Sequence, residues 1–397
     1  MAGKARARKV ASRRKPTARL PAFLPFTRPA IDEKTITAVS QVLRSGWITT
    51  GPQVEAFESA LSRYLGGRTV RAFTSATGAL EVALQACGIG HGDEVIVPAM
   101  TFAATANVVL RVGARPVFAD VALATRNLDL GQVEKAITPL TRAIMPVHFA
   151  GLPVDMDALY ALAQRRGLRV IEDAAHAIGS SHGGRRIGSF GDLVAFSFHP
   201  NKNVTTIEGG ALSIREPAEA KRVDRLRFHG IERNDDGSTD VLEAGGKYNL
   251  TDVAACVGLG QLRHLEQFNR RRRMLAARYF DRLKTDPPML LPARGDGGHS
   301  WHMFAPLLPL ERMRIGRDEF IAEMRKRGIG VGIHYPALHL FSLYRKMGHR
   351  IGHFPNAERI GQSTVTLPLF PAMSENDVDR VCESCSAILN KFRMDSR

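Results

Sequence analysis

A chain of 397 residues, 44% of them hydrophobic and 24% charged, has the size and composition of a globular protein with two lobes or with one large and one small domain. No apolar run approaches the roughly 20 residues that a membrane helix requires, and no apolar segment of a signal peptide follows the basic N-terminus. These features argue against membrane-spanning and secreted proteins and favour a cytoplasmic protein.

The formal net charge of +16 is concentrated at the N-terminus. Residues 1–20 contain eight lysines and arginines and no acidic residue, which is half of the excess charge. We predict a disordered basic tail over 1–20. Such a tail can bind nucleic acid or an anionic membrane, but no aromatic residue is interleaved to stack on bases. A solvated extension is therefore the preferred interpretation, and nucleic-acid or membrane contact is not expected.

The chain has four cysteines: Cys87, Cys256, Cys382 and Cys385. The last two form a C-x-x-C pattern, which can hold a metal or carry out redox chemistry. Ser374, however, has the sequence context of a helix N-cap, with Asp377 three residues later, and both thiols fall on the apolar face of the helix that follows. Core packing is therefore favoured, and no metal is expected.

Helical and strand-like patterns alternate along the chain after two N-terminal helices, which are expected at 30–46 and 53–67. Strands are expected at 69–74, 93–99, 115–121, 141–149 and 168–174, with helices at 76–88, 101–113, 131–137 and 155–167 between them. Two closing strands follow at 192–198 and 209–214, and one long helix is expected at 251–283. The arginine run 270–273 is expected on the solvated surface of that helix.

A smaller α+β segment is predicted beyond the long helix. Its strands are expected at 302–310, 330–335 and 363–369, and its helices at 317–328 and at the C-terminus. Alternating strands and helices favour a mostly parallel sheet. We therefore predict an α/β fold with a large doubly wound domain over 21–265 and a small α+β domain over 266–397. Ligands of such sheets bind at the carboxyl ends of the strands.

Three strand ends carry candidate functional residues. The first strand runs through Thr74-Ser75-Ala76-Thr77-Gly78 into a helix, so hydroxyls and free backbone N–H groups could bind a phosphate there; the alternative is a simple N-cap. The strand at 168–174 ends in Glu172-Asp173, with His176 close behind. A carboxylate at that end can hold a proton on a ring nitrogen, or it can cap the next turn.

The third strand end lies in "FSFHPNKNVTTIEGG", where Lys202 is the only lysine or arginine between Leu193 and Ile207. Pro200 ends strand pairing before it. Apolar surroundings lower the pKa of a lysine, which makes its neutral amine available to form a Schiff base. The alternative is an ordinary loop lysine. Together, a phosphate site, a ring-nitrogen carboxylate and this lysine are the groups that pyridoxal phosphate needs, and Phe102 could stack on its ring.

Several stretches together resemble the DegT/StrS-type nucleotide-sugar aminotransferases. These stretches are "SGWITTGPQVEAFE", "SATGALEVAL", "GDEVIVPAMTFAATANVV", "VIEDAAHAIG", "GSFGDLVAFSFHPNKNVTTIEGG", "KYNLTDVAA" and "GIGVGIHYPALH". The resemblance covers nearly the whole chain after residue 20. "FLPFTRPAI", "EDAAH" and "LPLFPAM" are most similar to the UDP-4-amino-4-deoxy-L-arabinose aminotransferase branch (ArnB type). That branch moves an amino group from glutamate to a UDP-linked 4-keto pentose, for modification of lipid A.

The resemblance implies the fold of the aspartate aminotransferase-like, fold type I enzymes and a role for each matching residue. Lys202 would bind pyridoxal 5'-phosphate covalently and move the proton during catalysis, and Asp173 would pair with the ring nitrogen. The further cofactor contacts would be Thr77, Gly78, Phe102, His176 and Ser197, with Asn249 reaching the partner subunit's phosphate across a homodimer interface. Trp47, Thr50 and His334 would lie near the nucleotide sugar. The substrates would be the nucleotide sugar and L-glutamate or 2-oxoglutarate.

Two alternatives remain from the sequence. The acceptor could be another nucleotide keto-sugar, such as the precursor of a 4-amino-4,6-dideoxyhexose. The protein could also be a non-catalytic sensor or nucleic-acid-binding relative that uses its basic tail. The full set of cofactor residues argues against the second alternative.

Overall fold

The computed structural model describes residues 22–394. The predicted basic tail over 1–20 lies outside these residues. Within residues 22–394, none of the helices is long and apolar enough to span a bilayer.

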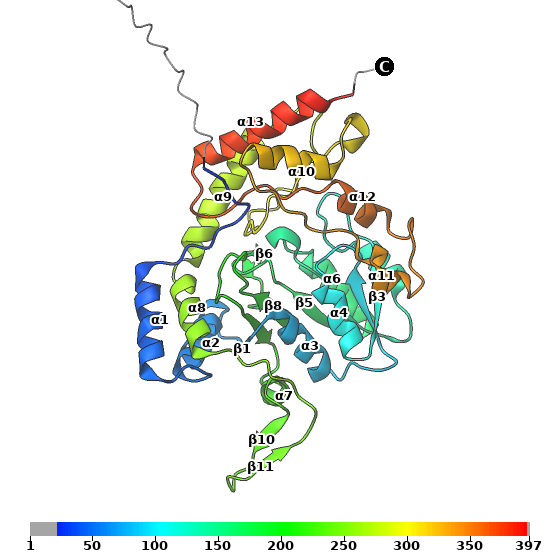
Figure 1. The fold of residues 1–397 in the computed structure, drawn as a ribbon. Helices are drawn as coiled ribbons and strands as arrows, with labels where there is room; N and C mark the ends of the chain where they lie inside the picture. Colours follow the sequence, from blue (N-terminus) through cyan, green and yellow to red (C-terminus); the bar gives the residue numbers. More distant parts are fainter. Residues whose placement is uncertain (1–21, 395–397) are drawn as a thin grey trace, which may run out of the picture.

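A seven-stranded sheet forms the centre of the fold (Figure 1). Its strands are β1 (Thr69–Phe73), β2 (Glu94–Pro98), β3 (Arg115–Ala119), β4 (Thr141–Ile144), β5 (Arg169–Asp173), β8 (Leu193–Ser197) and β9 (Gly210–Ile214). Their order is β1-β9-β8-β5-β4-β2-β3. Strand β9 runs antiparallel to both of its neighbours, and the other pairs are parallel. The carboxyl ends of β1, β2, β5 and β8 therefore lie along one edge, as a mostly parallel sheet predicts.

Helices cover both faces of this sheet, each over its own hydrophobic cluster. One face carries α3 (Ala76–Ala86), α4 (Ala104–Arg111) and α7 (Pro217–Arg227). The other carries α2 (Pro52–Tyr64), α5 (Leu130–Ala136), α6 (Met156–Arg166) and α8 (Asp252–Leu262), and α1 (Glu33–Ser45) packs on α8. The short helix η1 (Phe149–Gly151) follows β4. This is the doubly wound arrangement that the alternating pattern predicts.

Local capping explains where these helices begin and end. Asp155 accepts a hydrogen bond from the backbone of Ala158 at the start of α6. Gly167 ends that helix with φ +65, a left-handed conformation that glycine adopts without steric cost. The chain then turns directly into β5, so these two residues fix where the strand that carries Asp173 begins.

The C-terminal part is built on a third hydrophobic cluster. It contains α9 (Leu265–Arg282), η2 (Leu310–Arg312), α10 (Arg317–Lys326), η3 (Leu338–Leu340), α11 (Ser342–Arg345), α12 (Pro355–Ser363) and α13 (Glu375–Phe392). The third cluster joins α9, α10 and α13. Helices α11 and α12 instead pack Tyr344 and Ile360 into the first cluster of the sheet. Part of the predicted small domain over 266–397 therefore packs against the large domain.

Three expectations for this half of the chain were wrong in detail. The long helix predicted at 251–283 is two helices, α8 and α9, which meet at Arg263 and His264. The strands predicted at 302–310, 330–335 and 363–369 pair only through single bridges, such as Phe304 with Leu367 and Gly332 with Thr366. Arg272, expected on the solvated surface, is 2% exposed.

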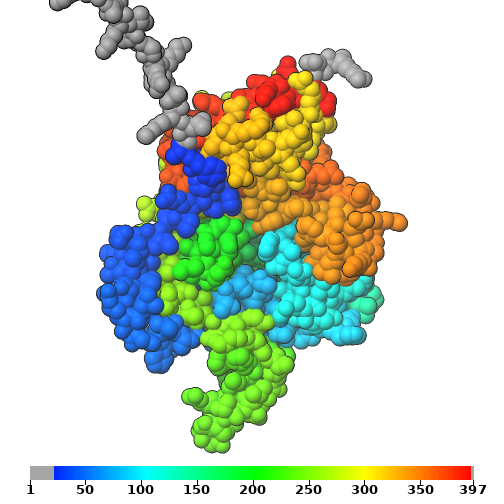
Figure 2. All heavy atoms as spheres, in the orientation of Figure 1, coloured from blue at the N-terminus to red at the C-terminus, as the bar shows by residue number. Residues whose placement is uncertain are grey.

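Two small antiparallel ribbons and the first described residues complete the fold. The strands β10 (Ile231–Arg233) and β11 (Thr239–Val241) form a hairpin that projects from the rest of the fold (Figures 1 and 2); a second small ribbon pairs β6 (Ser181–His182) with β7 (Arg185–Arg186). The first described residues lie against the C-terminal part, where Leu24 exchanges backbone hydrogen bonds with Gly328 and Gly330 (Figure 2).

Candidate active site

The carboxyl ends of β1, β2, β5 and β8 border a cavity of about 360 Å³. Seven residues singled out from the sequence line this cavity: Thr77, Phe102, Asp173, His176, Ser197, Lys202 and His334. They come from segments up to 257 residues apart, between Thr77 and His334. The sheet therefore gathers most of the predicted site residues around one space.

Lys202 lies in a turn directly after β8. Its backbone N–H donates to the carbonyl of His199 at 2.9 Å, which closes the turn around Pro200. The side chain reaches the cavity, and burial by the surrounding protein lowers the pKa of its amine to about 8. Asp173 acts in the opposite direction and raises that pKa. A substantial fraction of this amine is therefore neutral, and nucleophilic, near physiological pH.

Asp173 ends β5 and is 5% exposed. The Thr105 hydroxyl donates to its Oδ2 at 2.8 Å, and the Ala175 N–H donates to its Oδ1 at 3.1 Å. Burial raises the pKa of Asp173, while these two donors and the Lys202 charge lower it. Each oxygen thus accepts one hydrogen bond from the protein and can accept a second. The carboxylate can therefore accept a hydrogen bond from a ligand in the cavity.

His176 is held in one tautomer. Its Nδ1 accepts a hydrogen bond from the Ala150 N–H at 3.3 Å, so the proton is on Nε2, which lies 3.2 Å from the Tyr335 hydroxyl oxygen. Burial lowers the pKa of His176 well below its usual value, so the ring is neutral. The rings of His176 and Tyr335 are stacked at 6.0 Å, and Phe102 lies 5.9 Å from Tyr335. These rings form an aromatic wall of the cavity.

The N-terminus of α3 borders the cavity. Ser75 is the N-cap, and its hydroxyl accepts a hydrogen bond from the Gly78 N–H at 3.1 Å. Ser75, Ala76 and Thr77 all line the cavity. A helix N-terminus presents backbone N–H groups and a partial positive charge, which favour a phosphate group. The N-cap that the sequence offered as the alternative is therefore present, and the phosphate site stays a prediction.

Four predicted residues do not line this cavity: Trp47, Thr50, Gly78 and Asn249. Trp47 is 59% exposed, and its Nε1 donates to the Thr50 carbonyl at 3.1 Å. The Asn249 side chain donates to the Thr50 hydroxyl, and Gly78 packs beside the ring of Tyr248. Within this chain, Trp47, Thr50 and Asn249 form a separate group, so their roles in a shared site stay predictions.

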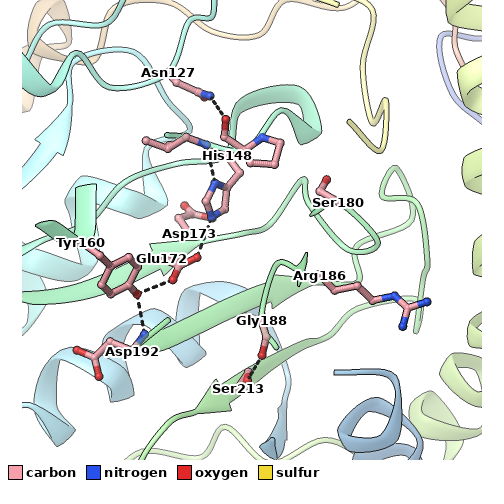
Figure 3. A network of polar contacts seen from close by, with 12 residues as sticks. Asn127, His148, Tyr160, Glu172, Asp173, Ser180, Arg186, Gly188, Asp192 and Ser213 are labelled. Atoms are coloured by element: carbon pink, nitrogen blue, oxygen red, sulfur yellow. Dashed lines mark hydrogen bonds and ion pairs between the residues drawn. The ribbon is translucent and has the colours of Figure 1, made fainter. Parts of the chain in front are cut away.

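A polar network on the face of β5 opposite to the cavity holds this strand in place (Figure 3). Because side chains alternate along a strand, Glu172 points away from the cavity into the protein. Its carboxylate accepts hydrogen bonds from His148 Nε2 at 3.0 Å and from the Tyr160 hydroxyl at 2.7 Å. The Tyr160 oxygen in turn accepts from the Asp192 N–H at 2.6 Å. This network links β5 to α6 and to the start of β8.

Sequence reasoning missed several residues of the site. Thr105 lies in the first turn of α4, four residues after Thr101, and the two hydroxyls are 3.0 Å apart. Tyr335 adjoins the predicted His334, but only the fold places its hydroxyl against His176. His199, Asn201 and Glu208 also line the cavity and flank Lys202 in the sequence.

The geometry fits pyridoxal 5'-phosphate. The cavity combines an anion-binding helix N-terminus, a buried carboxylate with free acceptor capacity, an aromatic wall and an amine with a lowered pKa. Each of these groups corresponds to one part of the cofactor: phosphate, ring nitrogen, ring face and aldehyde.

Comparison with known proteins agrees with this assignment. Residues 29–386 match the DegT/DnrJ/EryC1/StrS aminotransferase family. Spr1654 from Streptococcus pneumoniae, described as a sugar aminotransferase and solved in its PLP form, is 33% identical, with a TM-score of 0.87 over 93% of this chain and 99% of that one. DesV from S. venezuelae is 35% identical, with a TM-score of 0.85 over 94% and 100% of the two chains.

A third solved structure is PseC from Helicobacter pylori, an aminotransferase involved in the biosynthesis of pseudoaminic acid. It is 27% identical, with a TM-score of 0.88 over 93% of this chain and 100% of that one. The fold of these relatives is the fold type I architecture predicted from the sequence. The chain belongs to the DegT/DnrJ/EryC1/StrS aminotransferase family, and it is a pyridoxal 5'-phosphate-dependent aminotransferase.

Proposed function

We propose that the protein transfers an amino group from L-glutamate to a UDP-linked 4-keto sugar in the cytoplasm. The acceptor is the 4-keto pentose whose product is UDP-4-amino-4-deoxy-L-arabinose, for modification of lipid A. The observation that carries the amino-transfer chemistry is the pair of Lys202 and Asp173 in one cavity, each shifting the pKa of the other. The pentose is supported by the stretches "FLPFTRPAI", "EDAAH" and "LPLFPAM".

Each side chain of the site has its own task in the reaction. When bound, pyridoxal phosphate supplies an electron sink for the substrate carbon that loses or gains a proton. The Lys202 amine holds the cofactor and moves that proton, and Asp173 keeps the ring nitrogen protonated. Thr77, Ser197 and the N-terminus of α3 bind the phosphate.

The remaining predicted residues serve the two substrates and the ring. Phe102 and His176 pack beside the ring, and His334 contacts the nucleotide sugar from the cavity wall. Trp47, Thr50, Gly78 and Asn249 lie outside this chain's cavity. We assign Trp47 and Thr50 to the nucleotide sugar, and Asn249 to the partner subunit's cofactor phosphate in a homodimer. Gly78 contributes through its backbone at the start of α3.

The test is amino transfer from glutamate to a panel of UDP-, GDP- and dTDP-linked keto-sugars, followed by product mass. We expect the UDP-4-keto pentose to give the highest kcat/KM. Lys202→Ala, which removes the amine, is the control and should show no turnover above background. A preference for a hexose acceptor would replace the pentose with the alternative of a 4-amino-4,6-dideoxyhexose.

A further inference from the structure

The residue that follows Lys202 is tied to a distant helix. Asn203 is 4% exposed, and its side-chain Nδ2 donates two hydrogen bonds. One goes to Oδ1 of Asn269 in α9 at 2.8 Å, and the other goes to the carbonyl of Ser300 at 3.0 Å. The turn that carries Lys202 is therefore anchored at its far end by two buried contacts.

Asn269 joins this turn to the segment that follows Asp173. Its side chain is fully buried, and its Nδ2 donates to the carbonyl of Ile178 at 3.2 Å. The chain provides the space for this contact, because a Cβ at Gly179 would lie 2.2 Å from Asn269 Nδ2. A single amide thus connects the segments on either side of the cavity, one after β8 and one after β5.

The same face of α9 holds a third segment in place. Arg272, one turn beyond Asn269, donates from one guanidinium nitrogen to the carbonyls of Trp301, His302 and Leu369 at 3.2, 3.0 and 2.8 Å. Ser300, whose backbone carbonyl accepts from Asn203, also donates from its hydroxyl to the carbonyl of His176 at 3.2 Å. These contacts fix the position of α9 relative to the segments around the cavity.

We propose that Asn269 is a positioning residue for Lys202. Through Asn203 it holds the 198–203 turn against the 174–179 turn, and this sets the position of the Lys202 amine in the cavity that Asp173 also lines. Asn269 touches neither the reacting atoms nor the cavity. The inference rests on the proposed role of Lys202 but not on the identity of the sugar.

The property that Asn269 controls can be measured on the cofactor-free protein. Asp173 is the charged group that acts on the Lys202 amine. The charge of Lys202 in turn lowers the pKa of His176, His302 and His334, and Tyr335 lines the same cavity. Burial gives this amine a pKa of about 8. A turn released from Asn269 lets water reach the amine, so its pKa should move toward the ordinary value of 10.5.

The experiment measures the pH dependence of trace acetylation of Lys202 in the apoprotein, quantified by mass spectrometry of its peptide. For Asn269→Ala we expect the midpoint to rise by about one pH unit, and the dissociation of pyridoxal phosphate to accelerate about tenfold. Asn203→Ala removes the same bond from the side of the turn and should give a shift of the same sign. The double variant should add little to either single variant, because both interrupt one path.

Tyr279→Phe is the matched control. It removes a buried hydrogen bond of the same helix, from the Tyr279 hydroxyl to the Pro368 carbonyl at 2.7 Å, at the end remote from Lys202. It should lower the melting temperature without moving the acetylation midpoint. If Asn269→Ala and Asn203→Ala also lose stability with the midpoint unchanged, the positioning role is wrong. Failure to aminate any UDP-sugar would overturn the proposed substrate and leave this result intact.

Discussion

At the scale of single residues, the site depends on two opposite charges that share one buried space. Asp173 raises the pKa of Lys202 against the effect of burial, and Lys202 lowers the pKa of Asp173 against the same effect. Burial is the larger influence on both groups. The cofactor-free protein therefore carries an electrostatic cost at the place where the cofactor binds.

That cost predicts a pH-dependent stability. Because the pKa of Lys202 is about 8 in the folded chain and 10.5 ordinarily, the unfolded chain binds more protons between these values, and stability rises with pH there. Below pH 8 the full penalty, up to about 3 kcal/mol, is present. The Lys202→Met apoprotein should therefore be more stable than the parent at pH 7, with a gap that shrinks toward pH 10.5. Thermal melts of both proteins across this range check it; a constant gap would exclude a depressed pKa.

A second residue-scale prediction concerns the donor to Asp173. Thr105→Val keeps the shape of a fully buried side chain and removes the 2.8 Å hydrogen bond to the carboxylate. The carboxylate is then harder to keep ionised, so its hold on a protonated ring nitrogen weakens. We expect the Kd for pyridoxal phosphate to rise about tenfold, measured by fluorescence titration. Thr101→Val, which leaves the bond to Asp173 in place, should have a smaller effect; equal effects would contradict the assignment.

At the scale of elements, β5 serves the site with one side chain and the core with the next. Asp173 faces the cavity, while Glu172 joins His148 and Tyr160 on the reverse side (Figure 3). The backbone of Asp173 is itself paired with the segment after β4, through bonds to Pro146 and His148. The position of the functional carboxylate is therefore fixed by its strand rather than by its own side-chain contacts alone.

Glu172→Gln tests this anchoring. A glutamine oxygen can accept from His148 or from Tyr160, so one buried proton loses its acceptor. We expect a loss of about 2 kcal/mol in the free energy of unfolding, read as a lower midpoint in urea. Glu134→Gln is the control, because Glu134 pairs with Arg166 at the surface, where both side chains are about half exposed, and it should change stability by less than about 0.5 kcal/mol. A neutral Glu172→Gln would show that the network is dispensable.

Elements of the large domain could be predicted from the sequence because their signals are local. Alternating apolar runs and caps such as Asp155 and Gly167 place the strands and helices, and the strands then bring Asp173 and Ser197 to one edge. The break between α8 and α9 has no proline or glycine to mark it: His264, in the break, contacts Asp32 at 2.9 Å across 232 residues. Full strands were predicted near Phe304 and Thr366, where the structure has only isolated bridges between distant segments.

The site shows the same limit. Lys202 and Asp173 were recognisable from residues beside them in the chain. Asn269 was not, because its partners are 66 and 91 residues away and an asparagine within a helix has no distinctive pattern. Long-range polar contacts of this kind depend on the tertiary fold, which local periodicity does not specify.

At the scale of the whole molecule, the proposed homodimer would complete the site. Asn249 lies outside the cavity of its own chain, joined to Thr50 near the end of β1. If Asn249 binds the partner's cofactor, each active site takes Lys202 from one subunit and Asn249 from the other. Lys202→Ala and Asn249→Ala then remove groups that different subunits contribute to the same site. Each variant alone should be strongly impaired.

Mixing the two variants after reversible dissociation should restore activity. Random pairing makes half of the dimers mixed, and each mixed dimer has one intact site, so about a quarter of the parent activity should return. Kinetic assay against the protein ratio checks this, with Lys202→Ala mixed with itself as the control. No recovery, despite subunit exchange shown by mass, would place Asn249 in its own subunit's function.

The N-terminal segment has a further consequence for how the chain is made. Leu24 is buried in the third hydrophobic cluster and pairs with Ile329, about three hundred residues later in the chain. On the ribosome, this segment is made long before Ile329 and cannot take its native place until Ile329 has emerged. Helix α1, which follows it, packs instead on α8 (Asp252–Leu262), so the partner of α1 is made earlier than the partner of Leu24.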